Sequence, residues 1–235
     1  MTSVPLPQER LAARETTEEL ALFSVGWHHA VFEHYRVRDE TNFSKLLPTG
    51  FELDHYDGSG YMSIVSFQMV GMKLFESVPI PFIAKFPQIN IRVYVHRDGK
   101  PGVFFLRNYV SNRLASWGGK FGYAMPYRYQ PIETKVSSTN IHYSTTFSDS
   151  RHHQFSGRIA NSLQGHEDDP SSLLFFLVER YPLYSTRGIR LCESRMVHRP
   201  WKLHEVDVET QTHAIIDQLG LSSLVEPLQE VLYSP

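Results

Sequence analysis

The sequence contains a single cysteine among 235 residues, no long apolar run and no excess of charge of either sign. One cysteine, Cys192, excludes a disulfide within the chain. The longest apolar run, Leu173–Val178, is far shorter than a membrane-spanning helix, which needs about 20 residues. The first 20 residues are charged and lack the apolar core of a signal peptide, so we expect a cytoplasmic protein without a membrane partner.

Charge gives no sign of a polyanionic partner. The chain has 23 lysines and arginines against 25 aspartates and glutamates, which gives a net charge of -2 at pH 7. Basic residues do not cluster, and binding to nucleic acid rests on clustered positive charge. We therefore predict that the protein does not bind nucleic acid at physiological salt.

Common catalytic motifs are missing as well. The glycine pair before Lys120 is not a phosphate-binding loop, because Phe121 follows where Ser or Thr is required. No G-x-S-x-G, H-E-x-x-H or C-x-x-C pattern occurs. Two histidine pairs, His28-His29 and His152-His153, are adjacent in sequence, and neighbours on an unbroken strand point to opposite faces. We expect no metal site and no cofactor.

The most informative stretch begins with a strand predicted over Ile89 to His96. Its apolar residues alternate with polar ones, so one face is apolar and the other carries Asn90, Arg92 and Tyr94. Asp98-Gly99 and Pro101-Gly102 are predicted to form the turn into a second, central strand at residues 103–109. A short helix is predicted at residues 113–123, where the glycine pair indicates close backbone approach.

The rest of the chain is predicted to be rich in strands. Strands are expected at residues 51–56, 61–70, 127–137, 140–147, 154–160, 188–198 and 201–209, and helices after Asp39, after Asp169-Pro170 and at residues 212–219. Residues 72–87 form a long connection that could serve as a lid or pocket rim. Eight to ten strands with three or four short helices, and no βαβ alternation, indicate a mostly antiparallel α+β barrel or two packed sheets. Residues 1–18 are expected to be a loosely held arm and residues 19–235 a single domain.

Three segments carry a family resemblance: FPQINIRVYV, GKPGVFFL and ASWGGKFGYAMPY, in that order and spacing. They resemble the YqjF-like family of uncharacterised bacterial proteins, within the acetoacetate-decarboxylase-like superfamily, and the likeness extends from about residue 35 to the C-terminus. The resemblance implies a curved, cone-like antiparallel barrel with short helices outside and a pocket inside. From the residues alone, residues 19–36 are ambiguous, because 19–24 could form a helix whereas 27–35 alternate as a strand would. The resemblance favours the strand.

The sequence departs from the pattern of the superfamily at one catalytic position. Decarboxylases of the superfamily carry a nucleophilic lysine and a second lysine directly after a Gly-Tyr-Pro element. Here the matching proline is Pro126, and Tyr127 and Arg128 follow it. Neither is an amine that could form a Schiff base. Lys120 is the only lysine nearby, and we predict that the protein does not decarboxylate acetoacetate through a Schiff base.

The pocket itself could still be used. Tyr127 could donate a hydrogen bond or act as an acid, and Arg128 could bind a carboxylate through two parallel hydrogen bonds. As strand residues, both could equally be ordinary surface or packing side chains. Asn90 and Arg92 would line the interior if the apolar face of their strand packs against the outer helices. Arg92 would then need an acidic partner such as Glu133 or an anionic ligand; the alternative is an exposed polar face.

Three functions are compatible with these residues. The first is a protein that binds a small organic molecule, such as an oxo acid, in an interior pocket and converts it. The second is a ligand-binding or sensing module without catalysis, which the missing lysine favours. The third is a self-associating protein, a homo-oligomer whose aromatic residues, 13% of the chain, serve the core and subunit contacts. Converging polar groups in a closed cavity would indicate the first function, and a cavity with few titratable groups the second. An exposed apolar patch would indicate the third.

Overall fold

The alternating stretch forms a hairpin of two long strands, β6 (Lys85–Arg97) and β7 (Lys100–Val110). Its turn is Asp98-Gly99, whose φ angles of 50° and 78° suit a two-residue loop. The prediction that Pro101-Gly102 also belongs to the turn is wrong, because both residues lie in β7. Gly102 is needed elsewhere, since a Cβ on it would lie 2.6 Å from the backbone oxygen of Pro182 on a neighbouring strand.

The computed structural model describes residues 5, 9, 22–75, 77–122, 125–161, 169–187 and 190–235. Most of the expected arm at residues 1–18 therefore lies outside the described residues. In chain order, the elements besides β6 and β7 are β1 (Phe23–Val37), α2 (Glu40–Phe43), the 3₁₀ helix η1 (Ser44–Leu46), β2 (Glu52–Leu53), β3 (His55–Tyr56), β4 (Ser59–Leu74), β5 (Val78–Pro79), α3 (Arg113–Gly122), β8 (Tyr127–Tyr129), β9 (Glu133–Val136), β10 (Asn140–Thr146), β11 (His152–Ile159), α4 (Leu173–Val178), β12 (Pro182–Arg187), β13 (Arg190–Arg195), β14 (His204–Gln211), α5 (Ala214–Gln218) and β15 (Val225–Ser234). None of the described helices is long and apolar enough to cross a membrane.

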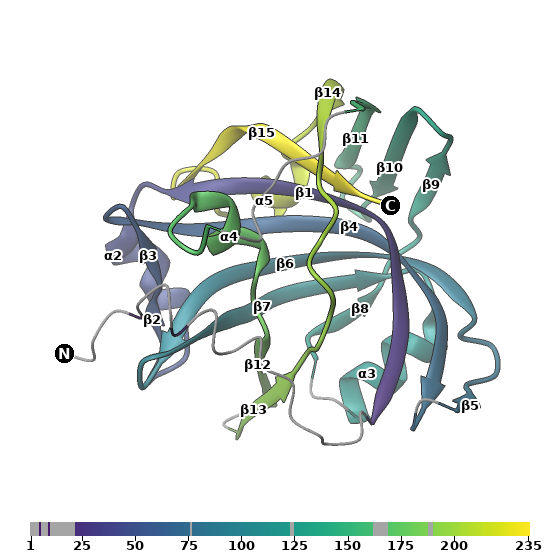
Figure 1. The fold of residues 1–235 in the computed structure, drawn as a ribbon, viewed down its shortest axis with the longest axis horizontal. Helices are drawn as coiled ribbons and strands as arrows, with labels where there is room; N and C mark the ends of the chain where they lie inside the picture. The colour runs from purple at the N-terminus through teal and green to yellow at the C-terminus, as the bar shows by residue number, and fades with distance from the viewer. Residues whose placement is uncertain are drawn as a thin grey trace.

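The predicted fold class is confirmed: the protein is mostly β, with one large curved sheet and four short α-helices. The main path of the sheet runs β13-β12-β7-β6-β4-β1-β15-β14-β11-β10-β9, and its two end strands are not paired with each other. Most pairs are antiparallel, while β7 pairs in parallel with β8 and with β12. In Figure 1 the long strands β1, β4, β6 and β7 lie side by side, and the segment from β13 to β14 crosses in front of them.

The number of strands exceeds the prediction, because the described residues form fifteen. The sequence analysis did not predict β12, which directly follows a predicted helix. It also did not predict β15, in which Pro227 interrupts the alternating pattern. Residues 72–87 are not one long loop, since β4 runs to Leu74 and pairs with β5. The expected strand at residues 127–137 is divided into β8 and β9 by Pro131.

Local sequence signals explain where most helices begin and end. The Asp39 carboxylate accepts a hydrogen bond from the Asn42 amide at 3.0 Å, so Asp39 caps α2 as predicted. Gly220, with a φ of 70°, follows the end of α5 as predicted. The predicted cap of α4 at Asp169 is wrong, because Ser172 accepts the capping hydrogen bond from the Phe175 amide.

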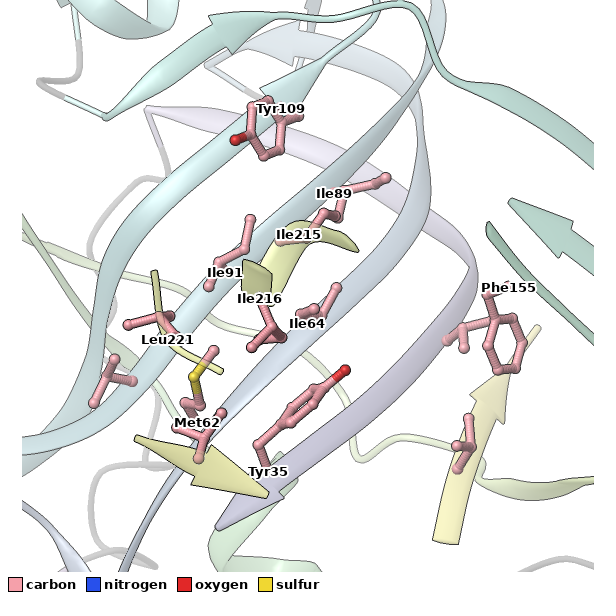
Figure 2. Packing of buried hydrophobic residues seen from close by; sticks show 14 of the residues in the cluster. Tyr35, Met62, Ile64, Ile89, Ile91, Tyr109, Phe155, Ile215, Ile216 and Leu221 are labelled. Atoms are coloured by element: carbon pink, nitrogen blue, oxygen red, sulfur yellow. The ribbon is translucent and has the colours of Figure 1, made fainter. Parts of the chain in front are cut away.

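Both faces of the sheet are buried, and each has its own core. On the face that we call the α5 face, isoleucines of β6 belong to one core with Ile215 and Ile216 of α5 and with Phe155 from the far end of the sheet (Figure 2). Tyr143 belongs to the same core. On the opposite α4 face, aromatic residues pack with Phe176 and neighbouring residues of α4. Successive residues of β6 therefore point into two different interiors.

Candidate functional site

A row of polar side chains crosses three adjacent strands on the α4 face. Asn90 of β6 is paired with Asn108 of β7, which is paired in turn with Tyr127 of β8. Gln88 and Arg92 stand on either side of Asn90 on the same face of β6. The structure thus brings three predicted site residues, Asn90, Arg92 and Tyr127, to one face of the sheet.

The two asparagine amides of this polar row are sealed from solvent without hydrogen-bond partners among the described residues. Asn90 is 0% exposed and Asn108 is 1% exposed. Both side-chain atoms of each asparagine lack a hydrogen-bond partner among the described residues, as does Oε1 of Gln88, which is 3% exposed. Leaving such a buried group unpaired costs about 1–3 kcal/mol. The α4 face therefore carries polar groups that the fold alone does not satisfy.

Arg92 is a buried cation, 2% exposed, rather than a solvated surface residue. Its guanidinium donates to the Leu177 carbonyl at 3.4 Å and lies over the rings of Phe32 and Tyr94. Within the described part of the chain it has no carboxylate partner, and its Nε has no acceptor. Burying a cation is costly unless an anion or several acceptors compensate it.

A directional hydrogen-bond chain runs beside Arg92. The Tyr94 hydroxyl donates to the Leu177 carbonyl at 2.7 Å, so it accepts from Ser63 Oγ at 2.6 Å, and Ser63 in turn accepts from His34 Nδ1 at 2.6 Å. This direction leaves His34 Nε2 as a buried acceptor that has no partner among the described residues. Burial, together with the cation of Arg92, lowers the pKa of His34 to about 3. His34 is therefore neutral at pH 7.

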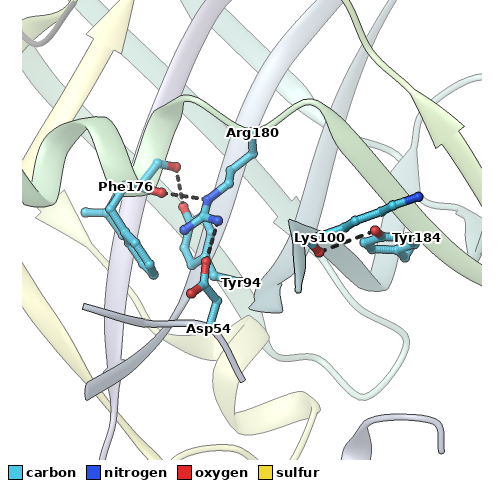
Figure 3. Close-up of polar contacts among 7 residues, drawn as sticks. Asp54, Tyr94, Lys100, Phe176, Arg180 and Tyr184 are labelled. Carbon is cyan, nitrogen blue, oxygen red and sulfur yellow. Dashed lines mark hydrogen bonds and ion pairs between the residues drawn. The ribbon is translucent and has the colours of Figure 1, made fainter. Parts of the chain in front are cut away.

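A fully buried ion pair anchors α4 over this region (Figure 3). Arg180 donates to the Asp54 carboxylate at 2.6 Å and to the Phe176 carbonyl at 2.7 Å. Its guanidinium also lies over the Phe176 ring, 4.1 Å from the centroid. The Arg180 contact ties the end of α4 to the segment between β2 and β3.

Tyr127 ends the polar row at its accessible side, where it is partly buried against Met125 and the α4-face core. Gly119 of α3 makes room for it, because a Cβ on Gly119 would lie 2.2 Å from the Tyr127 ring. The close backbone approach expected of the glycine pair is thus found at Gly119. Burial raises the pKa of Tyr127 to about 12, and a hydrogen bond with Gln88 opposes the shift. The phenol is therefore a hydrogen-bond donor near neutral pH.

The other predicted site residues lie apart from this row. Arg128 is exposed and points away from Tyr127, toward Tyr109 and Arg107. Glu133 is exposed on β9 and pairs with Lys135 at 2.7 Å, so it is not the partner of Arg92. Lys120 lies in the last turn of α3, and its side chain is outside the described residues.

Sequence reasoning missed Asn108 and Gln88 as members of the row. The turn at Asp98-Gly99 pairs Arg97 with Lys100, and an unbroken register would place Arg107 opposite Asn90. A β-bulge in β7 shifts the register by one residue and brings Asn108 there instead. Strand periodicity does not reveal a bulge, so this neighbour could not be identified from the sequence.

The histidine pairs also differ from expectation. His28 and His29 are not consecutive residues of a regular strand, since His29 has a φ of 56° and the register of β1 shifts there. His152 is exposed and His153 is buried, as alternation predicts. Within the described ranges, no group of three or more His, Cys, Asp or Glu residues could hold a metal ion.

Comparisons with known proteins agree on a family and a fold. The family DUF2071, an uncharacterized conserved protein, matches residues 24–235. The uncharacterized protein YqjF of Bacillus subtilis (strain 168) is 28% identical over 196 residues, which cover 83% of this chain and 81% of that protein.

Two solved structures show the same architecture at low identity. An acetoacetate decarboxylase-like enzyme from Sphingomonas wittichii RW1 has a TM-score of 0.61 at 16% identity, and the match covers 92% of this chain and 89% of that one. The enduracididine biosynthesis enzyme MppR, complexed with the condensation product of pyruvate and imidazole 4-carboxaldehyde, has a TM-score of 0.59 at 16% identity, with 92% and 87% covered. The predicted resemblance is thus confirmed: the chain belongs to the DUF2071 family and has the fold of the acetoacetate-decarboxylase-like enzymes.

Proposed function

We propose that this protein binds a small oxo acid on the α4 face, with the carboxylate of the ligand at Arg92 and its carbonyl group at Asn90 and Asn108. The observation that carries the proposal is the polar row itself. A buried guanidinium without a described carboxylate partner stands two residues from a pair of unsatisfied amides. An oxo acid presents a carboxylate and a carbonyl oxygen on adjacent carbons, and residues two apart on a strand are separated by only about 6.6 Å.

Ligand entry requires the site to open. The amides of the row are sealed from solvent, and α4 contacts the neighbouring Arg92 and Tyr94 through the Leu177 carbonyl. Tyr127 and Met125 are only partly buried and mark the edge at which the row approaches the surface. We place the opening there, because displacing two side chains costs less than separating α4 from its buried ion pair with Asp54.

The class of ligand is supported by similarity in fold. MppR holds a compound formed from pyruvate, which is an oxo acid. In this chain the position after Pro126 offers the phenol of Tyr127, which stays protonated and can donate a hydrogen bond to a carbonyl oxygen. We infer binding without Schiff-base chemistry, because neither Tyr127 nor Arg128 is an amine.

Calorimetric titration with pyruvate tests the proposal. We expect wild-type protein to bind pyruvate, and Arg92→Met to weaken binding at least about tenfold through loss of a charge-assisted contact. Asn108→Leu should also weaken pyruvate binding, and this substitution does not change the charge of the site. The matched control Arg128→Met removes an exposed arginine from the neighbouring strand and should bind like the wild type. Absence of wild-type binding, or equal affinity in all four proteins, would refute the site.

Borohydride trapping tests the absence of a Schiff base separately. Protein incubated with acetoacetate and sodium borohydride should show no reduced adduct by mass spectrometry and should release no carbon dioxide. An adduct on Lys120 that disappears in Lys120→Ala would show that the lysine chemistry of the decarboxylases operates from another position.

A second candidate function is self-association, which exposed apolar residues favour. Phe82 is 83% exposed and Trp117 is 66% exposed. The Asn112 amide donates to the Phe82 carbonyl at 2.8 Å, which joins this segment to the start of α3. Large exposed apolar groups near one another are typical of interfaces. Sedimentation velocity should show an oligomer that Phe82→Ser dissociates and that Leu46→Ser, a change at an exposed leucine of η1, does not.

A further inference from the structure

A cleft on the other side of the sheet has no role in the site described above. Its volume is about 810 Å³. It lies between the strands β1, β4 and β15 and the β9–β11 end of the sheet, and it is lined by His29, Gln68, Lys85, His204 and Tyr233, with Thr134 from β9. Gln68 and Tyr233 belong to the α5 side, so the cleft is separated from Asn90 and Arg92 by the sheet itself.

The backbone at His29 is built in an uncommon conformation. Its φ of 56° is rare for a residue other than glycine, and it coincides with the bulge in β1. Two tyrosines hold it there: the Tyr143 hydroxyl donates to the His29 carbonyl at 2.8 Å, and the Tyr233 hydroxyl lies 2.7 Å from His29 Nδ1. A strained residue persists only where its surroundings fix it, and such residues gather at functional sites. The bulge turns the imidazole toward the cleft.

The cleft is cationic on one side. Lys85 lines it, and the lining residues that the structure describes include no aspartate or glutamate; Pro235 also borders it. Burial lowers the pKa of His29, and nearby His28 and Lys85 lower it further. Lys85 thus supplies a positive charge to the cleft, while the neutral His29 ring can offer a hydrogen bond through Nε2 when Nδ1 accepts from Tyr233.

The cleft also offers buried polar groups that lack hydrogen-bond partners among the described residues. Gln68 is 7% exposed, and its Oε1 has no hydrogen-bond partner among the described residues. The hydroxyl of Thr134 is likewise buried and unpartnered within the described part of the chain. Such groups favour a ligand that carries a hydroxyl group in addition to its charge.

We infer that the cleft binds a small hydroxy acid, whose carboxylate contacts Lys85 and His29 and whose hydroxyl group contacts the Gln68 side chain. Lysine binds an anion as a compact point charge, and the fixed imidazole supplies a second donor. The wide opening of the cleft suits a ligand exchanged directly with solvent. This site shares no residue with the polar row on the α4 face, so either site can exist without the other.

Titration of isotope-labelled protein with malate, succinate and inorganic phosphate tests the inference by NMR. Malate should shift the side-chain signals of His29 and Gln68, whereas succinate, which lacks the hydroxyl group, and phosphate should bind at least about fivefold more weakly. Phosphate binding as tightly as malate would overturn the inference of a hydroxy acid.

Variants separate this cleft from the α4 face. The side chain of Lys85 is exposed, so Lys85→Gln should leave folding intact. It should weaken malate binding about tenfold, because one charged contact is lost. Lys73→Gln removes an exposed lysine of β4 outside the cleft and should bind like the wild type, as should Asn108→Leu. Equal malate binding by Lys85→Gln and Lys73→Gln, or shifts confined to residues outside the cleft, would overturn the proposal.

Discussion

The two faces of β6 carry neighbouring residues with opposite functions. Ile91 points to the α5 face, where apolar residues from β6, from α5 and from the far end of the sheet fill the interior. Asn90 and Arg92 point to the α4 face, where amides and a guanidinium are buried without full compensation. The first arrangement is what stability alone favours, and the second costs stability. This cost is expected if the polar row serves ligand binding, as proposed above, while the apolar residues around it serve the fold.

The largest expected effect concerns the ion pair that fastens α4. Asp54→Ala leaves Arg180 buried without its carboxylate and should lower the free energy of unfolding by about 3–5 kcal/mol. The exposed pair of Arg36 and Glu226, 3.9 Å apart, is the matched control, and Glu226→Ala should cost about 0.5 kcal/mol or less. Urea denaturation measures both. If both variants lose the same free energy of unfolding, the ion pair between Asp54 and Arg180 contributes no more to stability than an exposed pair.

The next prediction compares adjacent positions of β6. Ile91→Ala opens a cavity in the α5-face core and should cost about 2–5 kcal/mol. Asn90→Leu nearly conserves volume and removes two unsatisfied atoms, so it should be neutral or stabilise the fold by about 1 kcal/mol. Chemical denaturation curves of both variants test the contrast. A loss of several kcal/mol in Asn90→Leu would mean that the amide has protein or water partners important for folding.

Buried histidines and a buried glutamate should make stability respond to pH in opposite directions. On the α4 face the pKa of His34 is lowered to about 3, and at His153 burial lowers it to about 4. The unfolded chain takes up these protons below the ordinary histidine pKa of 6.5, so the free energy of unfolding falls as pH drops from 7 toward 4. Burial raises the pKa of Glu33 to about 7, so the folded state holds a proton that the unfolded state loses above 4.5. That contribution to stability is lost as pH rises through 7.

Denaturation between pH 4 and pH 8 separates these effects. Glu33→Gln should flatten the decline toward pH 8, and His34→Gln should flatten the decline toward pH 4. The exposed His152, changed to Gln, serves as a control and should follow the wild type. Curves for Glu33→Gln and His34→Gln that both follow the wild-type pH dependence would contradict both assignments.

The smallest expected effects are at the glycine pair of α3. Gly118→Ala meets no atom within 4 Å and should stabilise the helix by about 0.5–1 kcal/mol. Gly119→Ala brings a Cβ to 2.2 Å from the Tyr127 ring and should destabilise the protein, because the ring must move. Thermal melts of the two variants should shift in opposite directions. Shifts of the same sign would show that the Tyr127 ring is not held against α3.

The sequence predicted those parts of the fold that follow from local pattern. Alternation identified β6 and the shared face of Asn90 and Arg92, turn chemistry identified Asp98-Gly99, and motif resemblance identified the family. Alternation left open whether the polar face of β6 is buried, and the structure shows that it is. Partners that depend on register could not be predicted. The bulge in β7 that places Asn108 opposite Asn90, and the bulge in β1 that turns His29, insert one residue each and leave no periodic signal.

The exposed position of Glu133 shows a further limit of sequence reasoning. Glu133 was predicted as an acidic partner for an interior arginine, but β9 lies at the end of the sheet and pairs only with β10 among the described strands. Distances across a curved sheet depend on the full strand order, which includes β12 and β15, the two strands that pattern analysis missed. Chemical complementarity alone therefore does not identify contacts between distant segments.

Thermal denaturation with and without pyruvate tests most directly whether the polar row serves ligand binding at the expense of stability. Wild type, Asn108→Leu and Ser66→Ala are compared, the last removing an unsatisfied buried hydroxyl from the α5 face. We predict that Asn108→Leu has a higher Tm than the wild type without ligand and shows no shift with pyruvate, whereas Ser66→Ala keeps the wild-type shift. A lower Tm for Asn108→Leu together with an intact pyruvate shift would contradict the account.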